Sequence, residues 1–286
     1  STGETLTVED MMKGISMASA NDATVAMAEF LAGTEVEFVK KMNEKVKELG
    51  LKNTQFKNCT GLDEEGHYSS AYDMAVIARE LLKHEEILRF SSVYEDYLRE
   101  DTDNKFWLVN TNKLVRFYEG ADGLKTGHTD AAKYCLSATA KRENMRLIAI
   151  VLGEDNSSVR NSETMALLDY GFNTYEMQVV KKKDEVVKTE KLEKATKEKI
   201  EFVPLTDIGV LVKKGEGQKE YTYDIKIDNL KLPVKKGEAV GKVIVKDQNT
   251  IIAEGDLTVT EDIKPLSFLS LFKKTLQDIV AGKASI

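Results

Sequence analysis

Two short polar tripeptides, Ser19-Ala20-Asn21 and Lys125-Thr126-Gly127, carry residue types that could act together on a peptide. A serine hydroxyl can both accept and donate a proton, and a side-chain amide can orient a second amide. A lysine ammonium can hold a carboxylate through charge-assisted hydrogen bonds. A hydroxyl beside a basic group suits acyl transfer at a carbonyl, so the two tripeptides predict one shared cleft.

Each tripeptide also has a purely structural explanation. Ser19 could end a helix, and Asn21 could cap the helix that follows it. A strand lysine such as Lys125 usually faces solvent, and a threonine and a glycine in a strand mean little by themselves. For an isolated Ser-x-Asn the structural explanation is the more frequent one, because such tripeptides are common.

The first tripeptide lies where two predicted helices meet. Thr7 can cap the first helix, which is expected to end near 19–21. Asp22 can cap a second helix over 23–31, and Gly33 can end it. The hydroxyl and the amide of the first tripeptide are therefore expected at a helix junction.

The second tripeptide lies among short segments that are apolar or alternate between apolar and polar residues. Such segments, separated by turn residues, are typical of neighbouring strands in one sheet. The predicted strands are 109–114, 123–126, 134–140 and 147–152, and further helices are predicted over 35–49, 70–82 and 158–170.

The composition changes near Tyr175. Lysine and glutamate become dense from 181 to 199, all three prolines lie beyond this point, and short strand-like segments follow. The sequence therefore predicts a first domain over 1–174, a small β domain over 175–262 and a terminal helix over 263–286.

The predicted terminal helix is amphipathic and begins near Pro265. Lysines flank its apolar stripe, which suits a helix lying on an anionic membrane surface. The alternative is a helix docked on the β domain, and the pattern alone favours neither. The apolar positions at helical spacing are Leu266, Phe268, Leu269, Phe272, Leu276, Ile279 and Val280.

Composition excludes several other kinds of function. The net charge of −7 argues against nucleic-acid binding, which needs a cationic face. Cys59 and Cys135 lack the spacing of a zinc site or a disulfide framework. The three histidines show no metal-binding spacing and no glycine-rich phosphate loop occurs, so no metal and no cofactor are expected.

With these motifs in place, the chain resembles the D-alanyl-D-alanine carboxypeptidases, which are low-molecular-mass penicillin-binding proteins. The resemblance implies an α/β (α+β) fold, with helices around an antiparallel sheet, then a small all-β domain and a C-terminal amphipathic helix. The segments that carry it are Ser19-Ala20-Asn21-Asp22, Leu49-Gly50-Leu51-Lys52-Asn53-Thr54, Gly61-Leu62-Asp63, Tyr68-Ser69-Ser70-Ala71-Tyr72-Asp73-Met74-Ala75, Asp122-Gly123-Leu124-Lys125-Thr126-Gly127-His128-Thr129, Arg146-Leu147-Ile148-Ala149 and Gly171-Phe172.

The resemblance also implies an activity and partners. The family removes the terminal D-alanine from peptidoglycan stem peptides through an acyl-serine intermediate, and penicillin acylates the same serine. Members of the family are held on the outer face of the cytoplasmic membrane by their terminal helix. The resemblance therefore favours a membrane-surface helix over one docked on the β domain. The expected partners are therefore the stem peptide, β-lactam antibiotics and a membrane surface.

Site roles follow from the same resemblance. Ser19 would pass a proton toward the departing amine, and Asn21 would orient the substrate amide. Lys125 would bind the terminal carboxylate and favour deprotonation of neighbouring groups, and Thr126 would add a hydroxyl donor. Gly127 would let the substrate backbone approach the strand, and a backbone N–H near His128 would face the oxyanion.

The family's nucleophile motif, Ser-x-x-Lys, does not precede Ser19. Its one occurrence, Ser270 to Lys273, falls in the predicted terminal helix and is rejected as the active site. The chain is therefore expected to be a fragment that is inactive without an upstream Ser-x-x-Lys segment.

Two other functions remain open on sequence grounds. A non-catalytic protein could keep the cleft and bind peptidoglycan peptides. A β-lactamase would need an acidic residue to activate water, and Asp63, Glu64 and Glu65 lie in the appropriate half of the chain.

Overall fold

The computed structural model describes residues 3–100, 102–192, 195–197, 199–228, 230–267 and 272. They form two compact units, Ser1–Thr174 and Tyr175–Ile286. Helices surround an antiparallel sheet in the first unit and strands build the second, so the expected fold class is confirmed. Most of the predicted terminal helix, at 268–271 and 273–286, lies outside the described residues.

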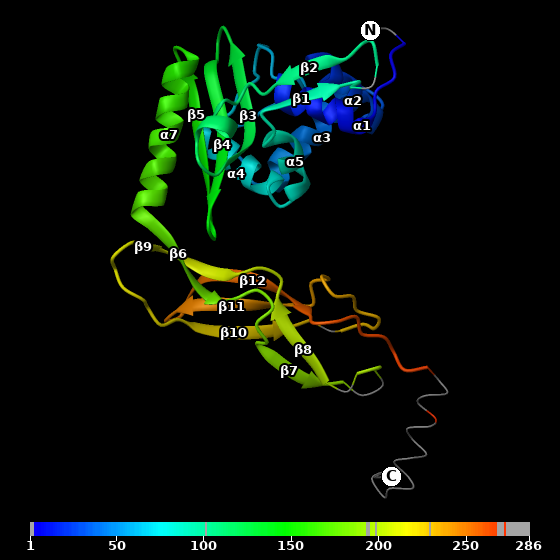
Figure 1. Cartoon of the computed structure of the whole chain (residues 1–286), viewed down its shortest axis with the longest axis vertical. Helices are drawn as coiled ribbons and strands as arrows, with labels where there is room; N and C mark the ends of the chain where they lie inside the picture. The colour runs from blue at the N-terminus through cyan, green and yellow to red at the C-terminus, as the bar shows by residue number, and fades with distance from the viewer. Residues whose placement is uncertain are drawn as a thin grey trace, which may run out of the picture. The chain divides into compact units, whose positions relative to one another are not determined.

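The central sheet of the first unit has the order β3-β4-β5, so β3 lies at an edge. Helix α7 runs along one side of this sheet, and α4 and α5 lie on the other (Figure 1). Gly171 of α7 permits close packing, because a Cβ there would lie 2.4 Å from a methyl carbon of Leu147. The elements are α4 Ala71–Leu81, α5 Leu88–Ser91, β3 Ala121–Thr129, β4 Lys133–Arg142, β5 Met145–Glu154 and α7 Ser157–Thr174.

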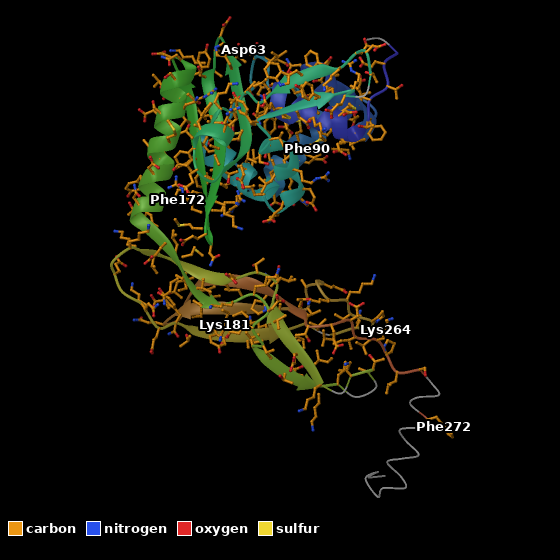
Figure 2. The ribbon with its side chains drawn as sticks, in the orientation of Figure 1. Asp63, Phe90, Phe172, Lys181, Lys264 and Phe272 are labelled. Atoms are coloured by element: carbon orange, nitrogen blue, oxygen red, sulfur yellow. The ribbon has the colours of Figure 1, made fainter. Side chains whose placement is uncertain are left out.

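Phe172, near the end of α7, is buried between the helix and the sheet (Figure 2). The guanidinium of Arg142 lies 4.5 Å from the centroid of this ring, a cation–π distance. Helix α7 itself begins after Asn156, whose side-chain oxygen accepts from the N–H groups of Ser158 and Val159. The buried face of α7 packs against the sheet that includes β3, the strand of Lys125.

The N-terminal helices follow the expected caps with one correction. The Thr7 hydroxyl accepts from the N–H of Asp10, as expected. Asp22 is not a cap, because α2 already begins at Asn21 with Ala20 in the capping position. The elements here are α1 Val8–Lys13, the π-helix η1 Gly14–Ala18, α2 Asn21–Ala32, α3 Glu35–Glu48 and the 3₁₀ turn η2 Glu85–Ile87.

The predicted strand over 109–114 is wrong. Val109 ends β2, which pairs with β1 in a separate hairpin, and Leu114 begins α6. Between them, the buried side chains of Asn110 and Asn112 hydrogen-bond to backbone groups. These local and long-range bonds replace the ladder hydrogen bonds of a strand. The elements are β1 Glu95–Leu98, β2 Phe106–Val109 and α6 Leu114–Phe117.

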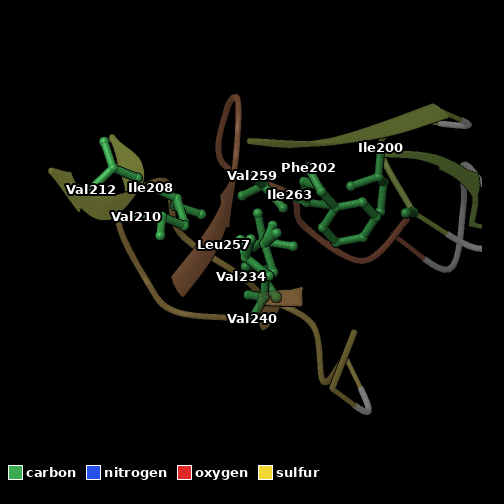
Figure 3. Packing of buried hydrophobic residues seen from close by; sticks show 13 residues of the cluster. Ile200, Phe202, Ile208, Val210, Val212, Val234, Val240, Leu257, Val259 and Ile263 are labelled. Atoms are coloured by element: carbon green, nitrogen blue, oxygen red, sulfur yellow. The ribbon is translucent and has the colours of Figure 1, made fainter. Parts of the chain in front are cut away.

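The second unit is built from a five-stranded sheet of order β10-β11-β12-β8-β7 and a separate β6-β9 pair. A cluster of buried aliphatic residues around Phe202 forms its core (Figure 3). Ile263 belongs to this core and bridges to Val234, so the β unit extends beyond the predicted boundary at 262. The strands are β6 Tyr175–Lys181, β7 Lys188–Lys191, β8 Lys199–Pro204, β9 Ile208–Lys213, β10 Thr222–Ile227, β11 Gly241–Asp247 and β12 Thr250–Val259.

Among the described residues, no helix is long and apolar enough to span a bilayer.

Candidate active site

The fold joins the two polar tripeptides through one hydrogen bond. Lys125 Nζ donates to Ser19 Oγ at 2.9 Å, although the two residues are 106 positions apart in sequence. Lys125 Nζ also donates to the backbone oxygen of Thr126 at 2.6 Å. The hydroxyl, the ammonium group and the threonine predicted to share a cleft are therefore neighbours.

Ser19 occupies an unusual backbone conformation at the end of η1. Its φ of 60° and ψ of 42° lie in the left-handed region, which costs a residue with a side chain about 1–2 kcal/mol. The turn is held by the N–H of Ala20, which donates to Gly14 O at 3.1 Å, and by fully buried Met17. The surrounding packing thus holds the Ser19 hydroxyl where Lys125 can reach it.

Asn21 lies at the same junction but is not connected to the lysine. It is the first residue of α2 and is exposed. Among the hydrogen bonds of the described residues, none links Asn21 to Lys125 or Thr126. The structure therefore leaves the Asn21 side chain exposed at the start of α2.

Lys125 combines partial burial with a positive charge that has no acidic partner. Burial, with a smaller contribution from the charge of Arg160, lowers the pKa of Lys125 to about 8. The salt bridges found in the described part of the chain do not include Lys125. At neutral pH the side chain is therefore mostly charged and suited to an incoming anion.

The lowered pKa predicts how carboxylate binding depends on pH. The charged form of Lys125 is lost above pH 8, so the affinity for a peptide with a free C-terminal carboxylate should fall about tenfold per pH unit beyond that point. Titrating a short peptide with a free C-terminal carboxylate between pH 6.5 and 9.5 measures this. A constant affinity up to pH 9.5 would contradict the assignment, and the Lys125→Gln variant should show no such fall.

The lowered pKa of Lys125 also affects the stability of the folded chain, which should rise with pH where the binding affinity falls. An unfolded lysine has a pKa near 10.4, so the folded chain binds this proton more weakly than the unfolded chain. The resulting destabilisation is fully present below pH 8 and is relieved as pH rises toward about 10. The charge of Lys125 is therefore kept at a cost in stability, which is characteristic of functional sites.

Sequence reasoning missed the segment 110–112, which completes the site. Thr111 Oγ1 lies 2.6 Å from Thr126 Oγ1, within hydrogen-bond distance. The N–H of Thr111 donates to Met17 O at 2.9 Å and so ties this segment to η1. A signal was available, since Asn-Thr-Asn directly after the apolar run Phe106 to Val109 is an abrupt change to small polar residues.

The two asparagines of this segment are buried, and both side chains are hydrogen-bonded. Asn110 Nδ2 donates to the backbone oxygens of Ser91 and Val93, and Asn112 Nδ2 donates to Gly123 O at 3.0 Å. The segment therefore connects η1, α5 and β3. It sets the spacing between the part of the site that carries Ser19 and the strand that carries Lys125.

A cavity of about 940 Å³ extends along β3 from Lys125 and Thr126 past Gly127 and His128. A Cβ at Gly127 would contact only the Cβ of Cys135, at 3.9 Å, so packing does not require glycine there. The exposed His128 ring packs on Tyr134, with the ring centroids 4.2 Å apart.

The far side of the cavity is the loop that precedes α4. Leu62, Asp63, Glu64 and Tyr68 line it. Asp63 lies at the end of the sheet, where its carboxylate accepts from the N–H of Ala131 at 3.3 Å (Figure 2). An open strand edge facing this loop can accommodate an extended peptide, because an edge strand offers unpaired backbone groups.

Comparisons with known proteins identify the family of this chain. Residues 1–156 match the family model described as D-alanyl-D-alanine carboxypeptidase, and residues 175–265 match the model of the penicillin-binding protein 5 C-terminal domain. The chain is 51% identical over 277 residues to the D-alanyl-D-alanine carboxypeptidase DacF of Bacillus subtilis. This alignment covers 96% of this chain and 71% of DacF. The chain spans 65% of the length of DacA of Haemophilus influenzae, to which it is 33% identical over 90% of its own length.

Solved structures show the same relationship. Penicillin-binding protein 5 of Haemophilus influenzae superposes with a TM-score of 0.63 at 32% identity, over 91% of this chain and 75% of that chain. Penicillin-binding protein D2 of Listeria monocytogenes, in its ampicillin-bound form, gives a TM-score of 0.54 at 35% identity, over 60% of this chain and 70% of that chain. With both of its units matched in sequence and structure, the chain belongs to the D-alanyl-D-alanine carboxypeptidase family.

Proposed function

We propose that this chain provides the carboxylate-binding side of the active site in a serine-type carboxypeptidase that removes the terminal D-alanine from peptidoglycan stem peptides. The observation that carries the proposal is the hydrogen bond between Lys125 Nζ and Ser19 Oγ beside the cavity along β3. It connects a hydroxyl that can pass a proton to a cation that has no acidic partner among the described residues. Both groups suit a peptide that ends in a free carboxylate.

In this proposal Lys125 and the Thr126 hydroxyl bind the terminal carboxylate of the substrate. A serine Oγ attacks the carbonyl carbon of the preceding residue and forms an ester as the peptide C–N bond breaks. The proton from the attacking hydroxyl reaches the leaving amine through Ser19, and free D-alanine departs. Water then hydrolyses the ester and restores the serine.

The remaining site residues bind and orient the substrate. The exposed amide of Asn21 orients the substrate's own amide, and Gly127 leaves room for the substrate backbone at the edge of β3. A backbone N–H near His128 stabilises the oxyanion that forms on the attacked carbonyl. Gly127 and His128 line the cavity along β3, and Asn21 is exposed at the start of α2.

The attacking serine must come from a Ser-x-x-Lys segment other than Ser270 to Lys273. That motif follows Lys125 in the sequence, whereas the family's nucleophile motif precedes its Ser-x-Asn motif. We therefore propose that the 286-residue chain alone does not form an acyl-enzyme. Binding groups without a nucleophile retain only a small part of the rate enhancement.

The proposal includes β-lactams as ligands, with the ampicillin-bound Listeria monocytogenes relative as support. It also includes a location on the outer face of the cytoplasmic membrane, with the amphipathic terminal segment resting on the lipid surface. The amphipathic pattern of residues 266–280 supports this part of the proposal.

The test compares the full-length gene product with the 286-residue chain. The full-length protein should form a stable adduct with a fluorescent penicillin and release D-alanine from a diacetyl-lysyl-D-alanyl-D-alanine peptide. The 286-residue chain should do neither. Stable labelling of the 286-residue chain would contradict the origin of the nucleophile, whereas rapid turnover of a chromogenic cephalosporin by the full-length protein would indicate a β-lactamase instead.

A further inference from the structure

We propose that Thr111 is a substrate-binding residue whose hydroxyl acts together with that of Thr126 to bind the terminal carboxylate beside Lys125. This inference rests on the proposed function, since it concerns the same carboxylate. It adds a residue from a third segment of the chain, between η1 and β3. The Ser-x-Asn and Lys-Thr-Gly signatures do not include it.

The first argument is the number of available hydrogens on the two hydroxyl groups. Thr111 Oγ1 and Thr126 Oγ1 lie 2.6 Å apart, so one hydroxyl donates to the other. Two hydroxyls carry two hydrogens, and this contact uses only one of them. The remaining hydrogen can point to a ligand, and the internal hydrogen bond makes it a stronger donor by polarising its oxygen.

The second argument is the number of donors left on Lys125. An ammonium group has three N–H donors, and here two of them go to Ser19 Oγ and the backbone oxygen of Thr126. One donor of Lys125 therefore remains. Together with the outgoing hydroxyl of the threonine pair it supplies two donors, which matches the two oxygens of one carboxylate.

The third argument is that Thr111 is held in place before any ligand arrives. Its N–H donates to Met17 O, and the flanking Asn110 and Asn112 are 0% and 1% exposed. Leaving either buried amide without its partners would cost about 1–3 kcal/mol per group. A donor that needs no rearrangement loses little entropy on binding, so its hydrogen bond contributes more fully to affinity.

The fourth argument is that Thr111 itself is exposed while its neighbours are buried. An exposed threonine in a loop needs no hydrogen-bond partner from the protein, because water satisfies its hydroxyl. Here the loop instead directs this hydroxyl to Thr126, which lines the cavity along β3. The arrangement places the exposed hydroxyl at the proposed carboxylate position.

The experiment compares Thr111→Val with Thr111→Ser in the 286-residue chain, where binding is measured without acylation. Ligand-observed NMR at pH 7 gives the affinities for acetyl-D-alanyl-D-alanine and for its C-terminal amide. Thr111→Val should weaken binding of the carboxylate about tenfold to 100-fold and leave binding of the amide unchanged, as expected for one lost hydrogen bond to a charged group. Thr111→Ser should restore the affinity to within about twofold, since it keeps the hydroxyl.

Thr102→Val is the matched control. Thr102 is also an exposed threonine in a loop, but its Oγ1 donates to Arg99 O, whereas Thr111 Oγ1 lies beside Thr126 Oγ1. This control should leave both affinities unchanged. Urea unfolding of each variant separates a loss of binding from a loss of folded protein.

Each outcome separates this inference from the proposed function. If Thr111→Val keeps the wild-type affinity for the carboxylate while Lys125→Gln loses it, Thr126 acts without Thr111 and the inference is overturned, but the proposed function stands. If wild-type chain binds the amide as well as the carboxylate, both are overturned. An equal loss for both ligands in Thr111→Val would assign Thr111 a purely structural role.

Discussion

Lys125→Gln should lower the second-order rate constant for acylation of the full-length protein by a carboxylate-bearing penicillin about 100-fold to 1000-fold. Glutamine removes the positive charge beside the cavity and the ammonium group that donates to Ser19 Oγ. A charge-assisted contact with a carboxylate is worth about 3 kcal/mol, and about 1.4 kcal/mol corresponds to a factor of ten in rate. The loss of proton transfer through Ser19 adds to the effect.

Stopped-flow measurement of acylation checks this prediction. Lys133→Gln is the matched control, because Lys133 is an exposed lysine on the neighbouring strand β4 whose partner is Asp155. The control should acylate within about twofold of wild type, as expected for a surface ion pair. A Lys125→Gln rate within threefold of wild type would remove this residue from the site.

Replacing Ser19 should also have a large effect, and two substitutions separate its hydroxyl from its backbone. Ser19→Ala and Ser19→Gly both remove the proposed proton relay, so each should lower the acylation rate about 100-fold. Their stabilities should differ, because the left-handed backbone at φ 60° suits glycine and strains alanine. The glycine variant should therefore be about 1 kcal/mol more stable than the alanine variant.

Acylation rates and urea unfolding of the two variants provide the measurements. Equal loss of rate with unequal stability would show that the hydroxyl, and not the backbone strain, is needed. A Ser19→Gly variant that acylates at the wild-type rate would exclude the proton-relay role. Binding of acetyl-D-alanyl-D-alanine should change little in either variant, since Lys125 keeps its charge.

Local sequence patterns predicted most elements of the first unit, because helix caps and strand alternation act over a few residues. Ser70 caps α4, whose observed range Ala71–Leu81 follows the predicted helix closely. The pattern failed at 109–114, where an apolar run continues into Asn110 and Asn112. These side chains bond to backbone groups of distant segments, which no local periodicity can reveal.

The sequence by itself determined which chemical groups are present and, through the spacing of the two tripeptides, the family to which they belong. Only the tertiary structure decided that Ser19 Oγ meets Lys125 Nζ, that Thr111 meets Thr126, and that burial lowers the pKa of Lys125. Distance, burial and charge environment depend on packing between residues far apart in the chain. The reactivity of this lysine is therefore a property of the folded molecule, whereas its identity as the cation of a Lys-Thr-Gly motif is already present in the sequence.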